Sequence, residues 1–184
     1  MRTPHLLITA CAGDQDAAYR RAELAIRDEL ARSLTEYPQL WRSPEEGAMV
    51  LAEEVDELWD EVRRNQIGRA RAEAAQVGAM ALRFIADVCE FSGSARQRCR
   101  VAAAEQRAAR GGVGPRWVLA SSHEGFGFLK REYDCLWAAI ASGGDVRAAA
   151  TRTAAMAVRF IAEITTAAHH DPGLAGCHRG GADQ

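Results

Sequence analysis

Patterns typical of β-strands are almost missing from the 184 residues, because the sequence has hardly any alternating run of β-branched side chains. Apolar residues instead recur at three- and four-residue steps in several long segments, and alanine, a strong helix former, makes up about a fifth of the chain. The sequence therefore predicts an all-α helical bundle. The expected helices span about 14–35, 44–64, 69–90, 94–110, 121–141 and 145–169.

Long hydrophobic runs are also missing, since no apolar stretch approaches the roughly 20 residues that cross a bilayer. The apolar run at 6–12 is too short for the core of a signal peptide. The five cysteines include no Cys-x-x-Cys pair, which argues against a zinc ribbon and, with their odd number, against a disulfide framework. We therefore expect a cytoplasmic protein that does not associate with membranes.

The chain has no excess of positive charge. Its 23 Lys and Arg residues stand against 25 Asp and Glu residues, for a formal net charge of −2, and only Lys130 is a lysine. Without a global positive field, nucleic acid is not an expected partner. The 94–110 helix nevertheless has a local basic face, which is either a solvated surface or a site for a triphosphate or a protein partner. Its arginines are Arg96, Arg98, Arg100, Arg107 and Arg110.

An internal repeat is the most informative feature of the sequence. Seven of the fourteen residues in 46–59 are identical at 124–137, and seven of the nine residues in 79–87 are identical at 155–163. This similarity predicts two tandem, degenerate three-helix units, residues 1–92 and 93–170. The glycine-rich residues 171–184 are expected to form a disordered tail.

The 44–64 helix begins with Ser43 as its cap and Pro44 at its first position, and Glu46 occupies the capping-box position. Helical periodicity then separates its side chains into stripes. One apolar stripe contains Leu51, Val55, Leu58 and Val62, and a neighbouring acidic stripe contains Glu54, Glu57 and Glu61. The remaining acids, Glu53, Asp56 and Asp60, point away from the acidic stripe. Carboxylates one turn apart repel each other unless a cation lies between them.

The next helix has its own polar border, on which Glu73 and Gln76 lie three residues apart, followed by Arg83 and Asp87. A short connection around 65–68 requires the two helices to pack antiparallel, so that one polar border faces the other. The combined oxygens would suit Mg²⁺ or Mn²⁺. Helical geometry alone leaves a merely charged surface as an equal alternative.

The pattern Glu53-Glu54-x-x-Glu57, then Glu73-x-x-Gln76 and Ala-Met-Ala-Leu-Arg-Phe at 79–84, resembles the MazG-like all-α nucleoside triphosphate pyrophosphohydrolases. The last segment is similar to the compact phage-type, MazZ-like dGTP pyrophosphohydrolases. The resemblance covers residues 20–90 and, more weakly, 96–165.

This resemblance implies hydrolysis of a (d)NTP to a (d)NMP and pyrophosphate, with dGTP or GTP favoured, in the host cytoplasm if the protein is phage-encoded. It implies Mg²⁺ or Mn²⁺ held by Glu54, Glu57 and Glu73. Gln76 stands where the family has Asp; its amide offers an oxygen but no charge. Glu53 or Asp87 would then compensate for the missing carboxylate.

Further roles are expected for four residues. Glu61, like Glu53 or Glu57, is a candidate to orient the attacking water. Arg83 either contacts phosphate or pairs with Asp87 one turn away. Trp59 either stacks on a base or belongs to the core. With Asp87, these residues form the expected substrate-binding set.

The second unit lacks most of the acidic pattern, because the residues that match Glu53, Glu57, Glu73 and Gln76 are Arg131, Cys135, Ala149 and Arg152. Glu132 and Asp134 remain, and Arg131 is expected to neutralise them. We therefore expect one working site per chain, with the second unit as its structural partner within the chain. The chain itself is expected to assemble into a homo-oligomer, a dimer or tetramer. The competing hypothesis is a non-catalytic helical module for binding or oligomerisation.

Overall fold

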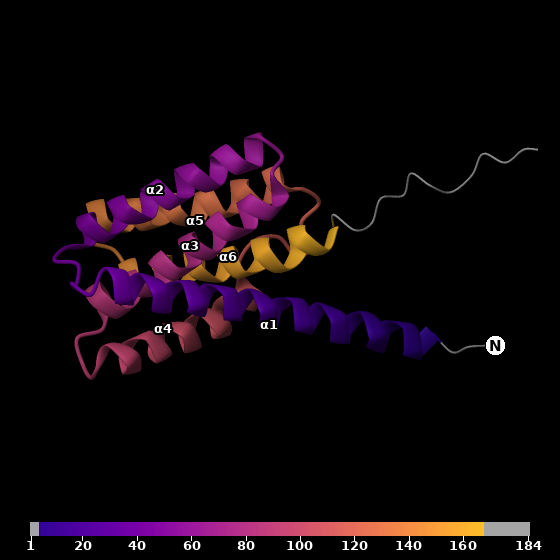
Figure 1. Ribbon diagram of the computed structural model, residues 1–184, viewed down its shortest axis with the longest axis horizontal. Helices are drawn as coiled ribbons and strands as arrows, with labels where there is room; N and C mark the ends of the chain where they lie inside the picture. The colour runs from indigo at the N-terminus through magenta and orange to yellow at the C-terminus, as the bar shows by residue number, and fades with distance from the viewer. Residues whose placement is uncertain (1–3, 168–184) are drawn as a thin grey trace, which may run out of the picture.

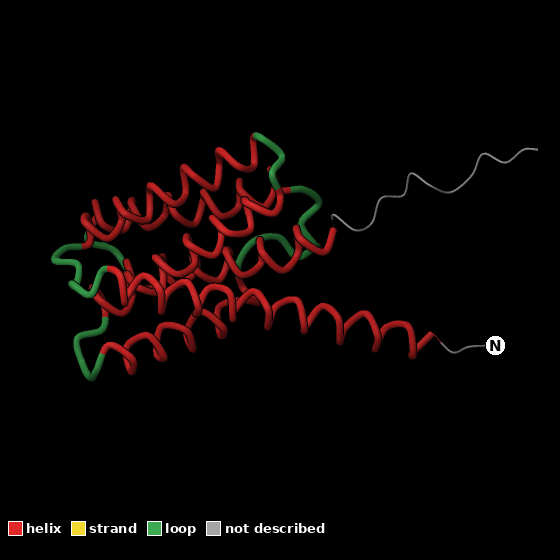
Figure 2. The backbone as a smooth tube through the Cα atoms, in the orientation of Figure 1, coloured by secondary structure: helices red, strands yellow, loops and turns green. Residues whose placement is uncertain are grey.

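A computed structural model describes the backbone of residues 4–167 and the side chains of residues 14–164. All regular structure in this part of the chain is helical (Figure 2). The α-helices are α1 (Pro4–Glu36), α2 (Pro44–Arg63), α3 (Ile67–Phe84), α4 (Ala95–Ala109), α5 (Ser122–Ser142) and α6 (Val146–Ala167). A π-helical turn, η1 (Ile85–Cys89), extends α3, and a 3₁₀ turn, η2 (Arg110–Gly112), follows α4.

The α-helices form three layers of two (Figure 1). Helices α3 and α6 form the central layer and pack against each other, while α2 and α5 cover one side of it. On the other side, α1 packs on both central helices and α4 packs mainly on α6 and η1. A single hydrophobic core includes residues from every α-helix, so both halves of the chain share it. The all-α prediction is confirmed.

The sequence located most helix boundaries within a few residues. The exception is α1, which begins at Pro4 rather than near residue 14. Alanine and leucine at 6–12 propagate a helix without contributing to the amphipathic pattern by which the helix was recognised. The region expected as a tail, 171–184, lies outside the described residues.

Serine caps begin three of the helices, as their sequences require. Ser43 caps α2 by accepting a hydrogen bond from the Glu46 backbone nitrogen at 3.2 Å, and Ser121 caps α5 in the same way through Glu124. Ser94 and Gln97 form a complete capping box at the start of α4. These caps satisfy backbone N–H groups that have no partner within the helix and so fix where each helix begins.

Matching residues of the two halves make matching contacts. Glycine occupies the first turn of both α2 and α5, where a Cβ would collide with a phenylalanine ring: Gly47 lies against Phe84, and Gly125 lies against Phe160. These close approaches let α2 and α5 pack tightly on α3 and α6. The contacts agree with the repeat seen in the sequence, whose origin by duplication stays a prediction.

Within the described residues, none of the helices combines the length and the apolar character needed to cross a membrane.

Candidate metal site and adjoining cleft

The candidate site begins with the two stripes of α2. Its apolar stripe, Leu51, Val55, Leu58 and Val62, is fully buried. This burial turns the neighbouring acidic stripe toward α3, so that Glu54 is half-buried while Glu57 remains exposed. Glu73 is half-buried on α3. The antiparallel pairing of α2 and α3 therefore brings acids from two helices to one place.

Three carboxylates converge at this place, Glu54, Glu57 and Glu73. One oxygen from each lies within 4.8 Å of the others. Gln76 contacts the same cluster, because its Nε2 donates a hydrogen bond to Glu73 Oε2 at 2.6 Å. The structure thus brings together the four residues that the sequence selected as metal ligands, from helices whose short connection fixes their pairing.

Glu54 lies in an environment that disfavours its negative charge. Its Oε2 is buried and has no hydrogen-bond partner among the described residues. Burial first, and then the charges of Glu57 and Glu73, together raise the pKa of Glu54 to about 7. Burial, followed by the charge of Glu57, also raises the pKa of Glu73. The cluster therefore favours binding a proton or a cation.

The donor set fits a hard divalent cation. All three acids offer oxygen, the ligand that Mg²⁺ and Mn²⁺ prefer, and no soft thiolate or imidazole belongs to the cluster. The unpaired buried oxygen of Glu54 is the kind of ligand atom that a cation would satisfy.

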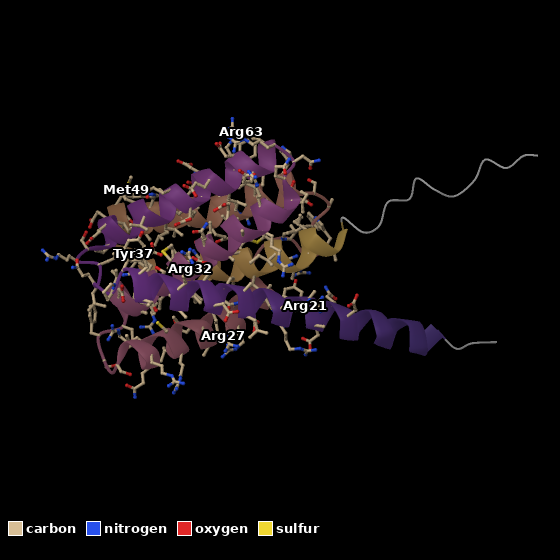
Figure 3. The ribbon with its side chains drawn as sticks, viewed as in Figure 1. Arg21, Arg27, Arg32, Tyr37, Met49 and Arg63 are labelled. Carbon is tan, nitrogen blue, oxygen red and sulfur yellow. The ribbon has the colours of Figure 1, made fainter. Side chains whose placement is uncertain are left out.

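A cleft of about 1000 Å³ adjoins the cluster. Glu53, Glu54 and Gln76 line one part of it. Met80 and Arg83 extend the α3 side of the cleft. The C-terminal part of α1, the loop after it and the first turns of α2 supply the rest, including two arginines and two aromatic residues. These are Arg32, Arg42, Tyr37 and Trp41. Figure 3 shows Arg32 and Tyr37 at the end of α1 that approaches α2.

Trp41 is held in the cleft wall from two sides. The guanidinium of Arg83 lies 4.9 Å from its ring centroid, a cation–π distance. The absence of a side chain at Gly47 leaves room for the ring, because a Cβ there would lie 2.7 Å from Trp41 Cε3. A rigidly held aromatic ring beside a cluster of acids can stack on a planar group of a ligand.

The cleft residues from the loop and α1 were not selected from the sequence. A signal was available at position 41, because the matching residue of the second half is Leu119. The aromatic residue thus occurs only in the half that has the acidic cluster. No helical periodicity extends into the loop, and so the stripe analysis could not reach it.

Arg83 is buried and pairs with Asp87, which was one of the two alternatives predicted from the sequence. Its side chain is 3% exposed, and its Nε lies 3.2 Å from Asp87 Oδ2. Its other nitrogens donate to Ser33 Oγ and to the carbonyl oxygens of Tyr37 and Gln39. These hydrogen bonds leave Arg83 poorly placed for the expected contact with phosphate, because they anchor the loop that forms the cleft wall instead.

The second half repeats this arrangement, which supports a structural role. Arg159 pairs with Glu163 and donates to the carbonyl oxygens of Val113, Pro115 and Trp117. An Arg–acid pair that recurs in the half without the acidic cluster could have been recognised from the sequence as structural.

Two other residues of the expected substrate-binding set do not line the cleft, whereas Arg83 does. Trp59 stacks on Phe126 of α5 with ring centroids 4.8 Å apart, which corresponds to the core alternative. Asp87 is buried between Arg83 and Arg98 and does not compensate for Gln76. In both cases a neighbouring helix supplies the contact, α5 for Trp59 and α4 for Asp87.

The remaining acids lie closer to the cluster. Glu61 forms an ion pair with Arg64 at 3.1 Å, but its Oε2 is buried and unpaired within the described part of the chain. Glu53 lines the cleft, although helical periodicity pointed it away from the acidic stripe. Glu53 is exposed and lies outside the three-carboxylate cluster, and it reaches the cleft because α1 and its following loop extend the site beyond the α2–α3 interface.

The second half contains an internal cation where the first half has Gln76. Arg152 Nε lies 3.0 Å from Glu132 Oε2, and Glu132 is buried. Arg131, which was expected to neutralise Glu132 and Asp134, lies at 3.5 Å from Glu132 and is more exposed, while Lys130 pairs with Asp134. In the second half, the charge of Glu132, which matches Glu54, is therefore balanced by the side chain of Arg152. The second half has no equivalent carboxylate cluster among the described residues.

No protein-family model matches the chain, and no curated protein or solved structure matches it.

Proposed function

We propose that the chain is a metal-dependent nucleoside triphosphate pyrophosphohydrolase that converts a (d)NTP and water to a (d)NMP and pyrophosphate. The observation that carries this proposal is the meeting of Glu54, Glu57 and Glu73 within 4.8 Å beside a cleft of about 1000 Å³. Clefts of this volume accommodate small ligands. The resemblance of the acidic pattern to MazG-like enzymes supports the same reaction.

Glu54, Glu57 and Glu73 hold Mg²⁺ or Mn²⁺ in this proposal, with Gln76 as a neutral neighbour. When bound, the cation supplies charge that offsets that of the triphosphate and lowers the pKa of the attacking water. Glu53 and Glu61 are the acids beside the cluster that would orient this water. Attack on the α-phosphorus would break the bond to the β-phosphoryl group and release pyrophosphate.

The cleft wall supplies contacts to the rest of the substrate. Arg42 lines the cleft, is exposed and can form hydrogen bonds with phosphate oxygens. Arg32 also lines the cleft, but its guanidinium is already paired with Glu29 and Glu36. Trp41, rather than Trp59, is the ring placed to stack on the base. The preference for dGTP or GTP rests on the family resemblance alone. The cytoplasmic location is proposed from the cysteine pattern and the lack of long apolar runs in the sequence, and assembly into a dimer or tetramer is part of the same proposal.

Incubation of the pure protein with each (d)NTP and Mg²⁺ or Mn²⁺ tests the reaction. The products should be monophosphate and pyrophosphate, and Glu54→Gln should lower kcat/KM at least about 100-fold, the scale of losing an essential electrostatic contact. Asp56→Asn is a matched control, because Asp56 is an exposed acid of the same helix outside the cluster. It should leave kcat/KM nearly unchanged.

Release of orthophosphate and diphosphate would contradict the proposed bond cleavage. The competing proposal, a non-catalytic helical module, predicts no turnover of any (d)NTP. It also predicts no Mn²⁺ binding in a calorimetric titration, with or without nucleotide.

A further inference from the structure

The basic face that the sequence indicated on α4 divides into two groups of arginines. Arg98 and Arg110 turn inward: Arg98 donates to the carbonyl oxygens of Ala86 and Gly93, and Arg110 pairs with Glu23. The other three, Arg96, Arg100 and Arg107, are exposed and have no partner within the described residues. The unpaired group lies along one side of the helix and faces α1.

These arginines border a groove of about 590 Å³ between α1 and α4, which we call the α1–α4 groove. The other two layers of the bundle are closed, because α2 packs on α5 and α3 packs on α6. Over their described residues, α1 and α4 make little direct contact with each other. The groove therefore opens between these two helices. Figure 1 shows α1 and α4 on the side of the central layer away from α2 and α5.

The floor of the groove is apolar, and its rim is positive. Leu30 and Leu34 of α1 and Ala103 of α4 form the floor together with Cys99. Arg27 completes the rim opposite the arginines of α4, and Figure 3 shows it on the side of α1 that faces α4. Arg27 also lacks a partner in the described part of the chain, and no acidic residue lines the groove.

We propose that the α1–α4 groove binds an acidic amphipathic helix of another protein. Its lining residues recur at three- and four-residue steps on both helices, which is the spacing of the surface that one helix presents to another. From Arg96 to Arg107 the α4 side extends for roughly 16 Å, about three helical turns. A partner helix with a narrow apolar stripe between rows of carboxylates matches both the floor and the rim.

The charge of the rim argues against a second copy of this chain as the occupant. A twofold-symmetric contact would place the arginines of one groove against those of the other, and like charges at an interface are unfavourable. A phosphate-bearing ligand would satisfy the arginines but would leave the partly accessible Leu34 and Cys99 of the floor in contact with water. Both features are satisfied together by a helix that is apolar on one face and acidic on its flanks.

Fluorescence anisotropy with the full-length protein tests this inference. The probe is a labelled peptide of about five helical turns, with leucines at three- and four-residue steps and glutamates on both flanks. Two matched peptides replace either the glutamates by glutamine or the leucines by serine. Only the first peptide should bind strongly, and its affinity should fall as the salt concentration rises.

The double variant Arg96→Glu/Arg100→Glu should weaken binding about tenfold or more, because two attractive rim charges become repulsive. Both side chains are exposed, so a matching thermal transition will show that the fold is retained. Arg21→Glu is the matched control, since Arg21 is an exposed arginine of α1 outside the groove (Figure 3). It should change the affinity less than about twofold.

Several results would overturn the inference. Equal binding of the serine peptide, or equal displacement by inorganic pyrophosphate or a DNA oligonucleotide, would indicate a simple anion site. Binding that is unaffected by the double variant, or no binding at all, would exclude the groove as the site. Sedimentation showing that the wild type self-associates and that the double variant is monomeric would assign the groove to a second copy. None of these results bears on hydrolysis, because the groove shares no residue with the acidic cluster.

Discussion

Glu54 is the residue whose environment most directly links stability to ligand binding. Its pKa of about 7 in the folded chain exceeds its reference value of 4.5, mainly because it is buried. The folded state therefore binds more protons than the unfolded state between these values, and this group's contribution to stability decreases as the pH rises. At neutral pH, the ionised carboxylate destabilises the fold unless a cation is bound.

Glu54→Gln should therefore stabilise the metal-free protein at about pH 8, by about 1–2 kcal/mol after allowance for solvent screening of this half-buried group. The difference from wild type should shrink as the pH falls toward about 5. Chemical denaturation of both proteins across this pH range measures it. Added Mn²⁺ should stabilise the wild type more than the variant. If the difference in unfolding free energy between the two proteins does not change with pH, the pKa of Glu54 is not raised in the folded state.

Arg152 and Arg131 allow the role of an internal cation to be measured in the second half. Arg152→Gln should lower the free energy of unfolding by about 1 kcal/mol, because buried Glu132 loses its nearer ion-pair partner. Arg131→Gln should have a smaller effect, since Arg131 is 58% exposed and 3.5 Å from Glu132. Urea denaturation of the two variants compares them. A larger loss in Arg131→Gln would reverse the assignment of the partner.

The helices α2 and α5 approach the central layer closely at their first turns. A Cβ at Gly47 would lie 2.8 Å from Phe84 Cδ2 as well as against Trp41, and a Cβ at Gly125 would lie 2.8 Å from Phe160 Cδ2. The two glycines thus make equivalent contacts with α3 and α6. Only Gly47 contacts an aromatic residue of the cleft wall.

Gly47→Ala and Gly125→Ala should each lower the free energy of unfolding by about 1–3 kcal/mol through overpacking, measured by urea denaturation. Gly47→Ala should in addition raise KM for the nucleotide, because the new methyl group displaces Trp41 from the cleft wall. Gly125→Ala should retain the wild-type KM below its unfolding temperature. If both variants change KM equally, the effect of Gly47→Ala does not arise from displacement of Trp41, and general destabilisation explains both results.

The whole molecule is organised around α3 and α6, which bring both halves of the chain into one core. Helix α1 of the first half also packs on α6 of the second. Each half therefore needs the other to bury all of its apolar surface. The two repeated segments of the sequence therefore contribute to one shared core.

Thermal unfolding should accordingly be a single cooperative transition, with equal calorimetric and van't Hoff enthalpies. Differential scanning calorimetry of the metal-free protein measures both quantities. Two resolved transitions would show that the halves unfold separately, in conflict with the shared core.

The helices and the acidic cluster were predictable because both depend on local periodicity. A stripe of leucines and valines on α2 decides which face is buried, and the glutamates beside it follow from helical geometry. The short connection between α2 and α3 then determines which helix supplies Glu73. These features involve residues within about 30 positions of one another.

Only the tertiary structure decided which residues surround the cluster. Arg83 is anchored to Ser33, Tyr37 and Gln39, which lie more than forty positions earlier in the chain, and these contacts make it structural. Packing of α2 on α5 places Trp59 in the core, while the return of the chain after α1 brings Trp41 to the cleft. Periodicity within one helix specifies a face, but the neighbour that meets this face depends on how the helices pack.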